Sequence, residues 1–165
     1  MRRILSLAAA AAILCAGTAG AYKEEPQSFG DMHWGDSVKK VRERYAVQYL
    51  EETRGGGALY AVNFSDFREI LGIRGPITVM GAFDSRGKLT QINVPLRMEG
   101  REAADRAFAD YTKMLEERCG APSERTKQSA LWTGKKTNIF VESSDEGILV
   151  CFIDAGSMKK QMAGK

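Results

Sequence analysis

Few side chains in this chain have the types and spacing that catalysis requires. His33 is the single histidine, so a Ser-His-Asp or Cys-His nucleophilic set would have to include it. It stands beside Trp34 ahead of a short predicted helix, and no Gly-x-Ser-x-Gly motif accompanies it. We therefore interpret His33 as a structural polar residue beside a packed tryptophan, and we predict no catalytic residue.

Metal and cofactor chemistry is equally poorly supported. One histidine and two distant cysteines do not have the spacing of zinc ligands, and the 21 acidic residues form no calcium-loop pattern. Gly55, Gly56 and Gly57 lack the following Gly-Lys-Ser/Thr and the helix that a phosphate loop needs. We expect no metal and no cofactor. A pair of carboxylates that hydrolyses a glycoside stays open, because a sequence does not reveal which acids lie close together.

The first 21 residues have the pattern of a secretory signal peptide. Arg2 and Arg3 precede an apolar run over 4–16, and small residues at 19–21 suit signal peptidase. The run is too short for a membrane-spanning helix. Ile13 and Leu14 before Cys15 are a poor fit to a lipid-attachment site. We expect cleavage between Ala21 and Tyr22, with Ala19 as the alternative, and a periplasmic or secreted mature chain without a membrane span.

An exported mature chain would keep two cysteines, Cys119 and Cys151. An even count in an oxidising compartment predicts a disulfide between them, which would close a loop of about 32 residues and contribute about 3–4 kcal/mol. Two buried thiols acting as small hydrophobes are the alternative. A redox-active pair is disfavoured, because Cys119 falls at the negative end of a predicted helix, where a thiolate is destabilised.

The remaining length of about 144 residues fits one domain with a real core. We expect a lead-in over 22–28, one α+β domain over 29–155 and a flexible tail over 156–165. The whole chain carries a formal charge of +3, and removal of Arg2 and Arg3 leaves 22 basic residues against 21 acidic ones. This balance provides no electrostatic footprint for nucleic acid or an anionic membrane.

Hydrophobic periodicity and turn residues predict the elements of this domain. Apolar residues three and four apart indicate helices, and alternating ones indicate strands. Asp36 or Ser37 is expected to cap the first helix, and Gly120 to end the second. Pro95 predicts that its strand ends there or lies at an edge. The helices are expected over about 36–45 and 101–118, and the strands over 47–51, 59–64, 77–83, 88–96, 130–133, 137–142 and 147–154.

The order of these elements predicts an α+β fold. Two helices would pack on a largely antiparallel sheet of about six to seven strands, because meanders with short turns follow each helix. Each half is a helix followed by a meander, so a tandem duplication is an open interpretation. The last strand, with apolar residues on both sides, is expected to be a central strand covered on both faces. Five aromatic residues are interpreted as core in preference to an exposed binding face: Tyr45, Tyr49, Tyr60, Phe64 and Trp132.

Several short stretches carry a resemblance to small exported bacterial domains. The stretch Trp34-Gly35-Asp36-Ser37-Val38, the hairpin turn over 83–89 and the helix ending over 115–122 are similar to those of the β-lactamase-inhibitor-protein-like architecture. That architecture also includes the small lipoprotein of the outer-membrane β-barrel assembly machinery. The resemblance implies a binding or scaffold role, and no functional residue of the family transfers to this chain.

Three functional hypotheses follow. The leading one is a non-enzymatic exported module that binds another protein or an envelope component. The second is a cell-wall or extracellular hydrolase that uses a carboxylate pair. The third is a carrier of a small ligand in an apolar cavity between sheet and helices.

Overall fold

The structure is a computed structural model that describes residues 22–65 and 69–163. Their helices are α1 (Val38–Arg42), α2 (Arg101–Cys119) and α3 (Ala155–Ala163). Their strands are β1 (Ser28–Phe29), β2 (Met32–His33), β3 (Ala46–Glu52), β4 (Ala58–Phe64), β5 (Ile77–Phe83), β6 (Leu89–Arg97), β7 (Glu124–Arg125), β8 (Ser129–Trp132), β9 (Thr137–Ser144) and β10 (Gly147–Asp154).

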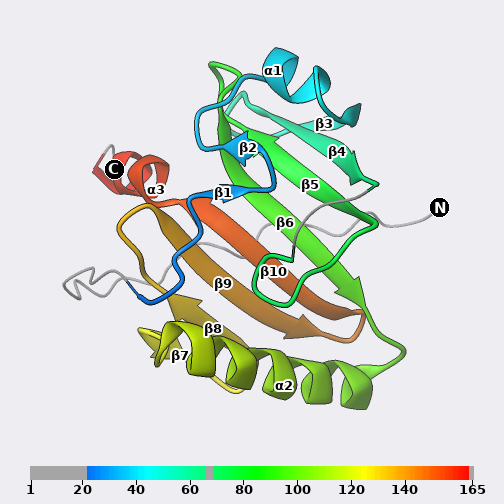
Figure 1. The fold of residues 1–165 in the computed structure, drawn as a ribbon, viewed down its shortest axis with the longest axis vertical. Helices are drawn as coiled ribbons and strands as arrows, with labels where there is room; N and C mark the ends of the chain where they lie inside the picture. Colours follow the sequence, from blue (N-terminus) through cyan, green and yellow to red (C-terminus); the bar gives the residue numbers. More distant parts are fainter. Residues whose placement is uncertain (1–21, 66–68, 164–165) are drawn as a thin grey trace.

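Eight strands form one antiparallel sheet in the order β3-β4-β5-β6-β10-β9-β8-β7, and β1 pairs with β2 in a small ribbon (Figure 1). The predicted α+β class and the antiparallel sheet are confirmed. The predicted counts are wrong, because β1, β2, β7 and α3 were not expected. The first three have two residues each, which is too short to produce an alternating pattern.

The sheet consists of two similar halves that meet at β6 and β10. Helix α1 is followed by the meander β3 to β6, and α2 is followed by the meander β7 to β10. The last strand of each half pairs with the other over a register from Gln91 opposite Ile153 to Arg97 opposite Gly147. The last strand, β10, is therefore central, as predicted.

The turn residues that the sequence indicates lie in the hairpins between β3 and β4 and between β5 and β6. Gly57 lies in the β3–β4 turn, where a Cβ would collide with the carbonyl oxygen of Phe83. In the β5–β6 turn the Asp84 carboxylate accepts bonds from the backbone N–H groups of Arg86 and Lys88, and Gly87 adopts φ +68°.

Pro95 lies inside β6 and does not end it. It pairs with Leu149 of β10, whereas the pairing of β6 with β5 reaches only Asn93 opposite Met80. The missing N–H of Pro95 therefore costs no ladder bond on the β5 side, where this part of the strand is locally an edge.

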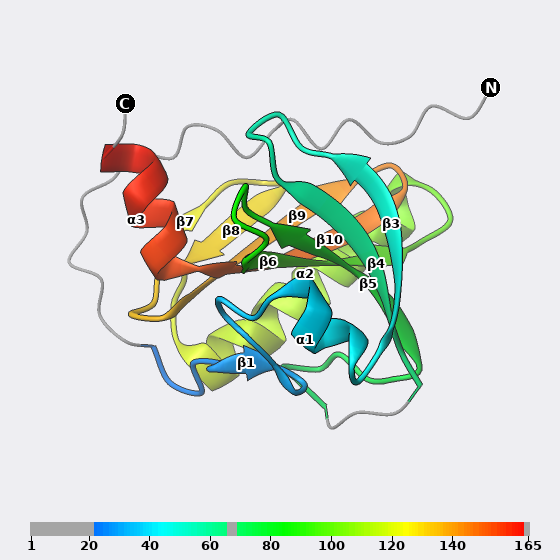
Figure 2. The same ribbon diagram turned by 90° about the horizontal axis from the view of Figure 1, so that it is seen from above.

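One face of the sheet, the covered face, carries the core. Helices α1 and α2 and the β1–β2 ribbon lie against it (Figure 2). Alternate residues of five neighbouring strands are fully buried there: Val62, Val79, Ile92, Val94, Val141 and Val150. Ala104, Phe108 and Leu115 of α2 pack on it, as the predicted stripe requires, and Thr112 and Cys119 join them.

The opposite face, the open face, carries the other residues of the same strands, among them Met80, Gln91, Asn93, Phe140, Leu149, Cys151 and Ile153. Of the described helices, α3 alone lies on this side, at the end of β10, where Asn138 Nδ2 contacts Met158 Sδ at 3.0 Å (Figure 2). Helix α3 occupies residues predicted to be a flexible tail. Both Asp154 carboxylate oxygens accept bonds from its first turn, which explains why it begins there.

Candidate functional site

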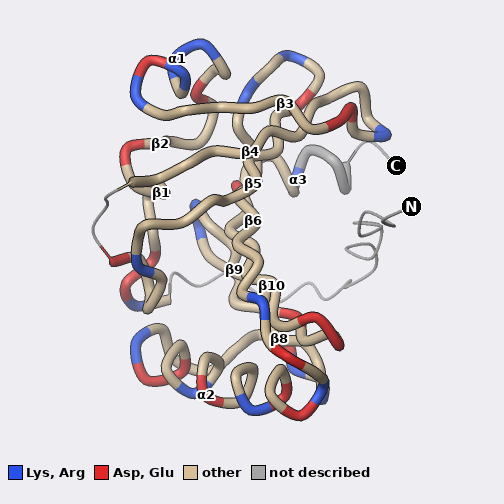
Figure 3. Tube along the Cα trace, turned by 90° about the vertical axis from the view of Figure 1, so that its right-hand side faces the viewer, with Lys and Arg blue, Asp and Glu red and all other residues tan. Residues whose placement is uncertain are grey.

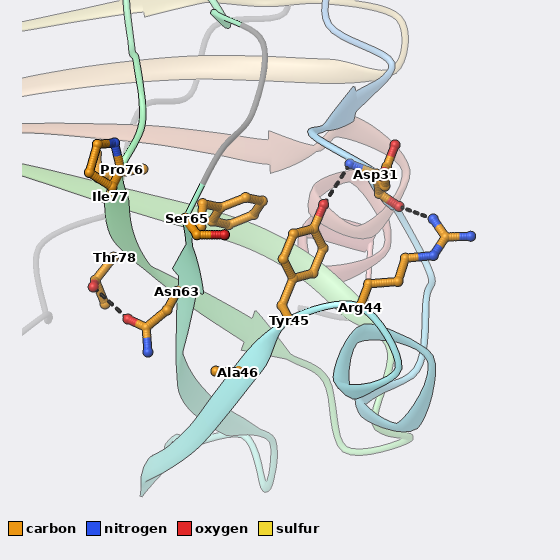
Figure 4. A pocket seen from close by; sticks show the side chains of 10 residues that line it. Asp31, Arg44, Tyr45, Ala46, Asn63, Ser65, Pro76, Ile77 and Thr78 are labelled. Carbon is orange, nitrogen blue, oxygen red and sulfur yellow. Dashed lines mark hydrogen bonds between the residues drawn. The ribbon is translucent and has the colours of Figure 1, made fainter.

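The ends of β3, β4 and β5 surround an open hollow of about 680 Å³ (Figure 4). Its lining is part apolar and part polar, and the polar groups come from β4 and β5, from the turn after β1 and from the residues just before β3 and just after β4. The ten lining residues are Asp31, Arg44, Tyr45, Ala46, Asn63, Phe64, Ser65, Pro76, Ile77 and Thr78. This is not the predicted cavity between sheet and helices, because the hollow lies at the rim of the sheet.

Hydrogen bonds hold the rim of this hollow in place. The Tyr45 hydroxyl accepts a bond from the Asp31 backbone N–H at 3.1 Å, and Arg44 donates to the Asp31 carbonyl oxygen at 3.1 Å. Thr78 Oγ1 donates to Asn63 Oδ1 at 2.6 Å across β4 and β5. The Arg44 guanidinium therefore stands just before the start of β3 as a fixed positive charge beside a polar opening.

The open face has a buried polar group at its centre. Asn93 is fully buried, and Cys151 and Met80 lie opposite it on β10 and β5. Its Oδ1 accepts a bond from Gln91 Nε2, but its Nδ2 has no hydrogen-bond partner in the described part of the chain. A buried donor without an acceptor costs about 1–3 kcal/mol of folding free energy. Asn93 Nδ2 is therefore a buried unsatisfied donor within the open face.

The predicted disulfide is not present, because Cys119 and Cys151 are both free and buried. Cys119 ends α2 and belongs to the core on the covered face, whereas Cys151 opposes Asn93 and Phe140 on the open face. The sheet separates the two sulfur atoms, and a bridge would require the backbone to move. Burial raises the pKa of Cys119 to about 11 and that of Cys151 to about 12. Both are small core residues, which was the alternative interpretation.

The residues after the predicted cleavage site are anchored, although a lead-in was expected there. The Tyr22 hydroxyl donates to the Thr137 carbonyl oxygen at 2.9 Å, and burial raises the pKa of this phenol. Glu25 Oε1 accepts bonds from the backbone N–H groups of Lys136 and Thr137. Thr137 Oγ1 donates to the Pro26 carbonyl oxygen. Ala21 and the rest of the predicted leader lie outside the described residues, so the structure does not test that prediction.

His33 lies beside a packed tryptophan, as the sequence suggests. Its side chain is 57% exposed, with Nδ1 3.8 Å from Asp36 Oδ2. The Trp34 indole N–H donates to Thr137 Oγ1 at 2.8 Å. Asp36 does not cap α1, because its carboxylate accepts from the His33 backbone N–H and from Lys40, while Ser37 accepts from the first turn.

Two arginines among the described residues each contact a pair of carboxylates. Arg118 contacts Glu24 at 2.7 Å and Glu69 at 2.8 Å. Hydrogen bonds from Arg74, then from Arg118, lower the pKa of Glu69. A general acid in a hydrolase needs the opposite shift.

The second carboxylate pair has the same arrangement. Arg101 contacts Asp105 at 3.0 Å and Asp145 at 3.4 Å. Its hydrogen bond lowers the pKa of Asp105. Basic and acidic residues also alternate along α2 (Figure 3), where Arg106 pairs with Glu102.

The described residues provide neither a metal-ligating cluster nor a helix that could cross a membrane. Residues 22–65 and 69–163 contain no cluster of three or more His, Cys, Asp or Glu side chains that could hold a metal ion. Within the same ranges, no helix has both the length and the apolar character needed to cross a bilayer.

The five aromatic residues that we interpreted as core differ in burial. Phe64 and Trp132 are 1% exposed, and Trp132 donates its indole N–H to the Gly120 carbonyl oxygen. Tyr45 and Tyr60 are half-buried against the core. Tyr49 is 53% exposed on β3, where its ring meets Tyr60 edge-on. The core interpretation is therefore wrong for Tyr49.

The sequence did not single out Asn93, Gln91 or Arg44. A polar pair in the middle of an otherwise apolar strand was the available signal for the first two, because β6 reads Leu-Thr-Gln-Ile-Asn-Val. Comparison of the chain with protein-family models, with curated proteins and with solved structures finds no match.

Proposed function

We propose that this chain is an exported, non-enzymatic binding module that holds another protein or an envelope component against the open face of its sheet. The leader pattern over residues 1–21 supports the export. The observation that carries the binding role is the buried Asn93 amide, whose Nδ2 lacks an acceptor in the described part of the chain.

The surroundings of Asn93 suit a partner that is part polar and part apolar. Half-buried apolar residues of β5, β9 and β10 border it: Met80, Phe140, Leu149 and Ile153. Apolar contact area of this kind provides binding free energy. The amide provides orientation once the side chains around Nδ2 shift and admit an acceptor from the partner, because Asn93 is fully buried in the free chain. The resemblance to the β-lactamase-inhibitor-protein-like architecture remains a prediction beside this argument.

The competing functions have weaker support. A carboxylate hydrolase requires one acid with a raised pKa, yet the arginines between the described carboxylate pairs hold the pKa values of Glu69 and Asp105 down. A small-ligand carrier would use the hollow at the rim of the sheet, where the polar rim and open shape suit a carrier less well than an enclosed apolar cavity would.

Site-specific photocrosslinking in living cells tests the proposal. A photoreactive phenylalanine analogue replaces Phe140 on the open face, and the matched control places it at Ala109, an exposed residue of α2. We expect one discrete adduct from position 140 and none from position 109, and an Asn93→Leu background should reduce its yield. No adduct from position 140, or equal adducts from both positions, would refute the proposal.

Export is tested separately by N-terminal sequencing of the purified protein. We expect Tyr22 as the first residue. A chain that retains Met1 in the cytosol would overturn the exported role, whatever the crosslinking shows.

A further inference from the structure

The two edges of the eight-stranded sheet differ. At one edge β7 has two residues, and at the other β3 has seven, nearly all of them exposed. The exposed large hydrophobic residues of the described chain are Tyr49 and Leu50, at 53% and 42% exposure, and both lie on β3. A long edge strand with free backbone groups and exposed apolar side chains is a template for another strand.

A basic residue lies before β3 and two acidic residues lie at its end. Arg44 stands two residues before the strand, beside the hollow, and Glu51 and Glu52 end the strand. Neither glutamate forms an ion pair with any residue that the structure describes. The exposed Glu43 and Arg54 lie just outside the strand, in the cap of α1 and in the glycine turn.

We propose that β3 pairs antiparallel with β3 of a second copy of this chain, so that two sheets join edge to edge. An antiparallel two-fold pair places the start of each strand beside the end of the other, and therefore sets Arg44 of each copy near Glu51 and Glu52 of the other. Gln48, midway between Arg44 and Glu52, lies at the centre. Val47, on the same side of the sheet as Tyr49, then meets Tyr49 of the second copy.

This charge pattern distinguishes a second copy from other occupants. An unrelated extended segment would need the same order of charges to match β3, whereas β3 is complementary to itself by symmetry. The bulge between Tyr49 and Glu51 shortens the regular ladder, so the pairing depends on the charges at its ends as well as on backbone hydrogen bonds. The pairing leaves both open faces accessible and does not depend on the proposed binding role.

Charge reversal with mixing tests the proposal by sedimentation velocity. We expect the purified protein to be a dimer whose dissociation constant rises at least about tenfold in Arg44→Glu and in the double variant Glu51→Arg, Glu52→Arg, because like charges then meet. Mixing the two variants should restore the dimer, because their charges become complementary. The controls are Lys113→Glu and Glu117→Lys on the exposed side of α2, which should leave the dissociation constant unchanged.

Cysteine crosslinking provides a measurement of register. Gln48→Cys should form an interchain disulfide under mild oxidation, and Gln128→Cys, also exposed, should not. A wild-type protein that stays monomeric at all concentrations, a dimer insensitive to both reversals, or reversals that mixing does not rescue would each overturn the proposal. A monomer that binds an extended peptide at β3 would also overturn it.

Discussion

Replacement of Glu25 by alanine should destabilise the protein far more than its place near the start of the domain suggests. Glu25 Oε1 accepts bonds from Lys136 N at 2.6 Å and from Thr137 N at 2.8 Å. Hydrogen bonds to a charged group contribute about 1.5–3 kcal/mol each, and the lower value applies because Glu25 is only half-buried. Two such bonds predict a loss of about 3 kcal/mol in the free energy of unfolding.

Urea denaturation measures this loss. With a slope of about 2 kcal/mol per molar urea, the midpoint should fall by about 1.5 M. The matched control is Glu24→Ala, which removes the neighbouring carboxylate. Glu24 is 51% exposed and pairs with Arg118 at the surface, so its loss should cost less than about 1 kcal/mol.

A second perturbation reaches the same contact from the other side. Gly134→Ala adds a Cβ that would collide with Glu25 Oε1 and with the Thr137 carbonyl oxygen. It should therefore destabilise the wild type more than it destabilises Glu25→Ala, because the variant has already lost the carboxylate. If Glu25→Ala and Glu24→Ala agree within about 0.5 kcal/mol, the anchoring of residues 22–27 on β9 is refuted.

Three further predictions concern single groups. Asn93→Leu should raise the free energy of unfolding by about 1 kcal/mol in urea titrations, because it removes a buried donor that has no acceptor, and a loss of stability would contradict this. Cys119 and Cys151 should react with iodoacetamide at pH 8 about a hundredfold more slowly than a free cysteine, because raised pKa values leave little thiolate, and peptide mass spectrometry should find both unbridged. Burial opposes ionisation of Asp36, but hydrogen bonds and nearby positive charge outweigh it and lower its pKa below 3.8. Its contribution should be present at pH 7 and lost as the pH falls below about 4, so the stability gap between wild type and Asp36→Asn should narrow there.

Local patterns in the sequence predict most of the sheet. Alternation identified the strands that become β4, β5, β9 and β10, and the turn residues Asp84 and Gly87 located the hairpin at 84–87. These features depend on neighbours within a few residues, so the sequence carries them directly. Helix α3 was missed because its amino-terminal cap, Asp154, is also the last residue of a strand.

Long-range contacts explain the failures. The disulfide prediction had no information on which face each cysteine would occupy, and that depends on how α2 packs against strands that follow it in the chain. Whether Asn93 Nδ2 meets an acceptor depends on its neighbours in the sheet. These include Met80 and Cys151, which are distant from Asn93 in the sequence. The residues that line the hollow likewise come from separate segments of the chain, between positions 31 and 78.

The stability of the two faces explains how the fold tolerates the Asn93 amide. On the covered face, a fully buried valine or isoleucine contributes about 1.5–3 kcal/mol relative to exposure, and β6 and β10 carry Ile92, Val94 and Val150 there at 0% exposure. An unpaired amide donor costs about 1–3 kcal/mol, so one such residue offsets it. Stability alone would favour an apolar residue at position 93, since a leucine there has no polar group to leave unpaired. Under the proposed binding role, an acceptor from the partner would satisfy this donor, which gives the amide a reason that stability does not.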